Sequence, residues 1–85
     1  MDAKNHENIN QIRLSLLGKS LWSVSEVAKY YGVSNDKARR IVVLTNNEYR
    51  PPKYSGYLSA KADGVIKLMG GVSREDEIKV IKNAI

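Results

Sequence analysis

The sequence predicts a single, mainly α-helical domain of about five helices, built around a helix-turn-helix at residues 24–43. Three observations lead to this fold class. Apolar residues recur at helical spacing in several segments, which glycine, serine or proline residues separate. A chain of 85 residues accommodates one hydrophobic core. Within residues 24–43, a small residue, a glycine and several apolar residues fall at the spacing that two closely crossing helices require.

The composition limits the kinds of site that the chain can contain. The absence of cysteine excludes disulfides, thiolate zinc sites and thiol nucleophiles. The sequence shows no convergent set of nucleophile, base and metal ligands, so we expect neither enzymatic activity nor a cofactor. The first residues are polar, and no apolar run approaches the roughly 20 residues of a membrane span. We therefore expect a cytoplasmic protein without a membrane partner.

The positive charge is concentrated in the middle of the chain. The formal net charge is +5 and the sequence pI is about 9.6. Residues 21–60 carry six basic and three acidic side chains, a net +3, whereas residues 1–20 and 61–85 carry +1 each. A pI above about 9 is typical of nucleic-acid-binding domains, although many small proteins are mildly basic for other reasons.

The first helix is expected from about Glu7 to Leu17. Its apolar residues follow helical spacing, and Gly18 provides a C-terminal stop. These apolar residues are Ile9, Ile12, Leu16 and Leu17.

The second helix is short and is the first helix of the expected helix-turn-helix. Ser23 or Ser25 caps its start, and Glu26 lies three residues after Ser23, as a capping box requires. Ala28 is the small residue that allows the next helix to cross closely. Gly32 ends the helix because glycine readily adopts a left-handed backbone conformation.

The third helix is expected to begin after Ser34, its cap, and to end between residues 45 and 47. The positions where the two helices meet the rest of the core are expected to be apolar, and they are occupied by Val27, Tyr31, Val33, Ala38 and Ile41. The outward positions carry three cations, Lys37, Arg39 and Arg40.

The outward positions of the third helix are the expected DNA contacts. In the major groove, Arg39 or Arg40 can pair with guanine, and Asn35 with adenine or a phosphate oxygen. Ser34 and the helix N-terminus are suited to hold phosphate. In the alternative interpretation, the two arginines form a solvated helix face.

Residues 46–58 are expected to form a loop or a short wing, because two prolines forbid regular helix there. The tyrosines of this segment either stack on nucleic acid or anchor the loop to the core. Two C-terminal helices follow, over residues 59–69 with Ser59 as cap and over residues 73–85 beginning at Ser73. The last helix presents an isoleucine stripe that forms either core or a dimer seam. This stripe consists of Ile78, Ile81 and Ile85.

From Trp22 to about Ile81, the chain resembles the helix-turn-helix domains of the MerR type and their small relatives, the phage excisionases and chromosome-anchoring proteins. The segments that carry the likeness are SVSEVAKYYGVSNDKARRIV, the wing-like RPPKYSGYLS, and ADGVIKLMGGVSREDEIKVI. The resemblance implies a winged helix-turn-helix that binds double-stranded DNA, with its wing on the phosphate backbone. By this resemblance, the phosphate-contacting residues of the wing are Arg50, Lys53, Tyr54 and Tyr57.

The chain also departs from that family. Ile41, Val42 and Val43 stand where the family's reading helix usually has aromatic residues, and residues 1–20 form an additional N-terminal helix. Without cysteine, the chain lacks ligands for thiolate metal sensing.

Two functions follow from these patterns. The first is sequence-specific binding of double-stranded DNA, as a transcriptional regulator or as an excision or recombination accessory factor of a phage or other mobile element. The alternative is a helix-turn-helix scaffold for protein–protein interaction, as in a replication or packaging accessory protein. A homodimer or a partner-protein contact through the C-terminal helix fits either function.

Overall fold

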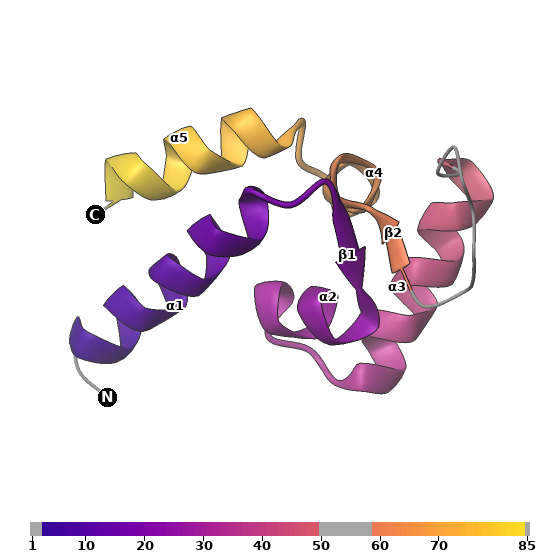
Figure 1. The fold of residues 1–85 in the computed structure, drawn as a ribbon, viewed down its shortest axis with the longest axis horizontal. Coiled ribbons are helices and arrows are strands. Elements are labelled where there is room, and N and C mark those ends of the chain that lie inside the picture. Colours follow the sequence, from indigo (N-terminus) through magenta and orange to yellow (C-terminus); the bar gives the residue numbers. More distant parts are fainter. Residues whose placement is uncertain (1–2, 50–58, 85) are drawn as a thin grey trace.

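The computed structural model describes residues 3–49 and 59–84 and confirms the mainly helical fold, with five helices and a small sheet in those ranges (Figure 1). The elements in chain order are α1 (Ala3–Leu17), β1 (Leu21–Ser23), α2 (Val24–Tyr31), α3 (Asn35–Glu48), β2 (Ser59–Lys61), α4 (Ala62–Leu68) and α5 (Arg74–Ala84). Helices α1 and α5 pack against each other on the side of the molecule away from α3 (Figure 1). The arrangement is compatible with a winged helix-turn-helix.

A two-stranded antiparallel sheet joins the two halves of the chain. Trp22 of β1 lies opposite Ala60 of β2. The prediction that Ser59 caps a helix over residues 59–69 is wrong, because pairing with β1 holds residues 59–61 in an extended conformation. Helix α4 begins after them, where the Ala62 N–H donates to the Ser20 carbonyl at 2.9 Å.

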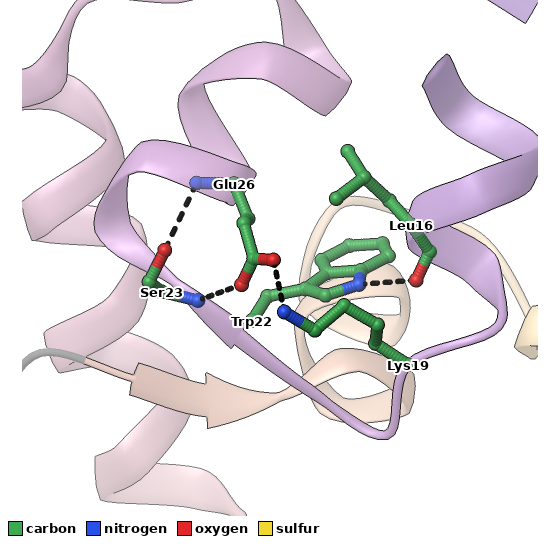
Figure 2. Close-up of polar contacts among 5 residues, drawn as sticks. All are labelled: Leu16, Lys19, Trp22, Ser23 and Glu26. Carbon is green, nitrogen blue, oxygen red and sulfur yellow. Dashed lines mark hydrogen bonds and ion pairs between the residues drawn. The ribbon is translucent and has the colours of Figure 1, made fainter. Parts of the chain in front are cut away.

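Trp22 lies at the centre of the core and is fully buried. Its indole N–H donates to the Leu16 carbonyl at the end of α1, at an N–O distance of 2.7 Å (Figure 2). Its ring lies 4.8 Å from the ring of Tyr30 on α2, measured between centroids. A buried indole requires such a partner for its N–H. This residue therefore connects α1, α2 and the sheet.

Tyr30 connects α2 to both flanking helices. Its hydroxyl donates to Glu77 Oε1 of α5 at 2.9 Å. Arg13 of α1 donates from Nε to the Tyr30 carbonyl at 3.1 Å, with its guanidinium 5.6 Å from the centroid of the Tyr30 ring. Burial raises the pKa of both Tyr30 and Tyr31, and the Glu77 carboxylate raises it further, to about 12 for Tyr31. Both phenols therefore stay protonated at neutral pH.

The start of α2 has the expected capping box, with Ser23 as the cap (Figure 2). The Glu26 N–H donates to Ser23 Oγ at 3.2 Å, and the Ser23 N–H donates to Glu26 Oε1 at 2.8 Å. Lys19 forms an ion pair with the other carboxylate oxygen of Glu26. Burial by itself raises the pKa of Glu26, but the bonds from Lys19 and Ser23 outweigh it and lower this pKa below its ordinary value.

Helix α1 is longer than predicted, and its apolar face is less buried. It begins at Ala3 rather than near Glu7. Leu16 and Leu17 are buried as expected, but Ile9 and Ile12 are 45% and 46% exposed. Because α1 extends away from the body of the fold, its last turn reaches the core and its earlier turns do not (Figure 1).

The C-terminal helices complete the core. Gly64 in α4 is required by close packing, since a Cβ there would lie 3.0 Å from atoms of both Thr45 and Tyr49. In α5, Ile81 is buried and Ile78 packs against the core, so these two residues belong to the core. Ile85 lies outside the described residues. Ser73 begins the helix as predicted, by accepting a hydrogen bond from the Asp76 N–H at 3.2 Å.

We expect Trp22→Phe to lower the free energy of unfolding by about 1–3 kcal/mol, because a smaller ring leaves part of the fully buried indole site empty and one of the two hydrogen bonds to the Leu16 carbonyl is lost, that from the Lys19 N–H remaining. Urea denaturation followed by far-UV circular dichroism measures this loss. The control is Val80→Ala, at a side chain that is 62% exposed, for which a change within about 0.5 kcal/mol is expected. An unchanged midpoint for the phenylalanine variant would contradict the role assigned to Trp22.

We expect Glu26→Gln to reduce the loss of stability in acid. Because folding lowers the pKa of Glu26, its ionised carboxylate stabilises the fold at pH values above 4.5, the ordinary pKa of the group. This contribution disappears as the pH falls through the folded-state pKa. At pH 7 the variant should be less stable by about 0.5 kcal/mol, as for other exposed ion pairs. The difference from the wild type should vanish near pH 2 when both are followed by urea denaturation. A constant difference across the pH range would contradict this account.

Candidate nucleic-acid interface

The turn between α2 and α3 has the backbone conformation that the sequence predicts. Gly32 has φ 63° and ψ 40°, in the left-handed region, and its N–H donates to the Ala28 carbonyl. The Val33 N–H donates to the same carbonyl at 3.1 Å. A Cβ atom at Gly32 would have no neighbouring atom within 4 Å, so the backbone angle is what favours glycine here. The turn sets the direction in which α3 leaves α2.

One face of α3 is buried against the rest of the fold. It packs on α2, α4 and β2. The buried residues of this face are Ala38, Ile41, Val42, Thr45 and Asn46. This face determines which side of α3 is presented to solvent.

The opposite face of α3 carries the predicted contact residues. The structure brings five of them together as exposed side chains at the start of α3: Ser34, Asn35, Lys37, Arg39 and Arg40. Ser34 is the cap, and its Oγ accepts a hydrogen bond from the Lys37 N–H at 3.2 Å. The exposed N-terminus of α3 carries the partial positive charge of the helix dipole.

The cations of this face are available to a ligand. Within residues 3–49 and 59–84, the ion pairs are Lys19–Glu26 and Arg74–Asp63. Lys37, Arg39 and Arg40 therefore have no acidic partner in that part of the chain. An anion that approaches the start of α3 meets three cations and one carboxylate, Asp36, a net charge of +2.

The four predicted wing residues, Arg50, Lys53, Tyr54 and Tyr57, lie outside the described residues. Helix α3 continues to Glu48, so the expected loop begins later than residue 46. Tyr49 lies against Gly64 of α4, with Lys67 Nζ 5.9 Å from the centroid of its ring. This tyrosine therefore anchors the chain to the core, which was one of the two roles open to it.

Asn46 joins the end of α3 to β2, a contact that sequence reasoning missed. Its Nδ2 donates to the Ser59 carbonyl at 2.9 Å, and its Oδ1 is buried without a hydrogen-bond partner among the described residues. Strand β2 therefore lies beside the last turns of α3. The signal was present in the spacing, since Asn46 follows Val42 by four residues on the buried face.

Comparison with protein-family models, curated proteins and solved structures finds no match to the chain. The described helices include none that is both long and apolar enough to span a membrane. The described residues also contain no group of three or more acidic or histidine side chains arranged as metal ligands. The outward face of α3 is therefore the candidate functional site.

We expect substitutions of Gly32 to destabilise the fold through the backbone alone. Gly32→Ala should cost about 1 kcal/mol, because an L-residue is strained in the left-handed region. Gly32→Val should cost more, since a β-branched side chain tolerates this region least, and Gly32→Asn less than alanine. Thermal unfolding of the three variants gives the order, and an unchanged melting temperature for the valine variant would show that the turn is assigned wrongly.

Proposed function

We propose that this chain is a small non-enzymatic protein that binds double-stranded DNA through α3, as a transcriptional regulator or as an excision or recombination accessory factor of a mobile element. The outward face of α3 carries this proposal. Lys37, Arg39 and Arg40 are exposed together on a helix whose opposite face is buried. Cations in this arrangement neutralise DNA phosphates and release their counterions.

The dimensions of α3 suit the major groove. Its 14 residues extend over about 21 Å at the usual rise per residue. The major groove of B-DNA is about 12 Å wide and admits one helix. Because the inner face of α3 packs on α2, α4 and β2, the helix can enter the groove as a rigid part of the domain.

The residues of α3 divide between phosphate and base contacts. At the helix N-terminus, Ser34 and Asn35 are suited to a phosphate, and the Ser34 O–H remains able to donate because Oγ accepts from Lys37. Arg39 and Arg40 lie about one turn further along, where their guanidinium groups can reach guanine edges. Asn35 is the alternative contact for adenine.

The proposed wing contacts rest on the resemblance to MerR-type domains. Tyr49 and Ser59, the two described residues nearest to the proposed wing segment, both lie beside the last turns of α3, Tyr49 as its C-cap and Ser59 through the hydrogen bond from Asn46. We assign phosphate contacts in this segment to Arg50, Lys53, Tyr54 and Tyr57. Together with α3, they would extend the basic contact surface along the DNA backbone.

Exposed apolar residues on the α1–α5 pair favour a second function, the binding of a partner protein. Ile9 and Ile12 of α1 are 45% and 46% exposed, and Val80 of α5 is 62% exposed. Such side chains are suited to a protein interface, and the helix-turn-helix would then serve as a scaffold. Salt dependence of binding distinguishes this function from DNA binding.

The decisive experiment is a salt titration of binding to a random-sequence duplex, followed by fluorescence anisotropy. For a DNA-binding protein, log K should fall by about 0.9 for each phosphate contact per log unit of salt. We expect a steep slope that corresponds to several contacts. If no salt-sensitive duplex binding appears at low salt, DNA binding is excluded and the scaffold function is favoured.

We expect the double substitution Arg39→Ala and Arg40→Ala to weaken duplex binding at least tenfold, since each guanidinium contact contributes about 1–3 kcal/mol. Helicity should not change, because both side chains are exposed. The matched control is the pair Lys79→Ala and Lys82→Ala, which removes the same charge from exposed positions of α5. Equal affinities of the two double variants would show that α3 is not the contact helix.

A further inference from the structure

Val43 and Leu44 interrupt the polar outward face of α3 with two exposed apolar side chains. They are 44% and 53% exposed. Each follows an arginine by four residues, so they lie one helical turn beyond Arg39 and Arg40 on the same face. A shallow hollow in the surface is lined by Asp36, Arg39, Arg40, Val43 and Leu44. The two arginines and the two apolar side chains therefore line one surface that a single ligand can cover.

We propose that Val43 and Leu44 contact the 5-methyl group of a thymine, and thereby make an A·T base pair part of the recognised sequence. This inference rests on the proposed function, because it requires α3 to lie in the major groove. The thymine methyl is the apolar group that base edges display in that groove, and exposed apolar side chains are its usual partners. The arginines by themselves would select guanine.

The spacing along α3 places this thymine relative to the arginine contact. Four residues of helix correspond to about 6 Å. Base pairs are stacked about 3.4 Å apart. The thymine should therefore lie within about two base pairs of the base that Arg39 or Arg40 contacts. The recognised sequence is then a short element that combines a guanine with a neighbouring thymine.

The charge around the apolar pair favours DNA over a protein as its ligand. Lys37, Arg39 and Arg40 are exposed on α3 and outnumber the one carboxylate of its first turn, Asp36, and none of the three cations forms an ion pair in the described ranges. Two partly exposed side chains also provide far less than the roughly 800 Å² per partner that a stable protein interface buries. A base edge, by contrast, offers a single methyl group that two side chains can cover.

The test replaces thymine by deoxyuridine, which removes the 5-methyl group and leaves the hydrogen-bonding edge unchanged. Binding sequences are first selected from a random duplex library with the full chain, and each thymine of the selected site is then replaced singly. At one or two positions we expect the wild type to bind about fourfold more weakly, the value of one buried methyl group. The double variant Val43→Ala and Leu44→Ala should bind both duplexes equally.

Val80→Ala is the matched control, because it shortens an exposed apolar side chain on another helix and should keep the fourfold methyl effect. Circular dichroism checks that all variants fold. The inference is overturned if the selected site contains no thymine, if no uracil substitution weakens binding, or if the loss persists in the double variant. In each of these outcomes, salt-sensitive duplex binding by the wild type would leave the proposed function standing. Absence of any duplex binding would overturn both.

Discussion

The burial of Trp22 is the constraint on which the other packing contacts depend. The indole is fully buried, so its N–H must find an acceptor inside the protein, and the Leu16 carbonyl at the end of α1 supplies it. Trp22 also lies on β1, which pairs with β2, and its ring stacks on Tyr30 of α2. In a core without phenylalanine, this one side chain connects elements from both halves of the sequence.

The position of α3 follows from that core. Tyr30 holds α2 against α1 and α5, through Arg13 and Glu77, and the turn at Gly32 then directs α3 across α2. Gly64 allows α4 to approach α3 closely. A glycine inside a helix costs about 1 kcal/mol relative to alanine, and the close packing of two helices offsets this cost. The outward face of α3 is thus the side that remains after three elements have covered the other.

The stability of the fold and the charge of its surface are largely separate properties. The side-chain hydrogen bonds that join α1, α2, α5 and the sheet involve Arg13, Trp22, Tyr30, Asn46 and Glu77, and the ion pairs of the described residues lie away from α3. Arg39 and Arg40 of α3 make none of these contacts, so both side chains are available for binding a ligand. This separation explains why substitutions on the outward face should affect a ligand without affecting the fold.

The sequence by itself determined the local features: the caps at Ser23 and Ser34, the left-handed turn at Gly32, and the outward position of the cations of α3. These depend on residues within a few positions of each other, so periodicity and spacing reveal them. The tertiary structure alone decided the strand at residues 59–61, the Asn46–Ser59 contact and the Tyr30–Glu77 hydrogen bond, whose partners are 47 residues apart. It also decided that Ile9 and Ile12 stay exposed. Contacts between distant residues leave no periodic signal, because they depend on where the elements meet in space.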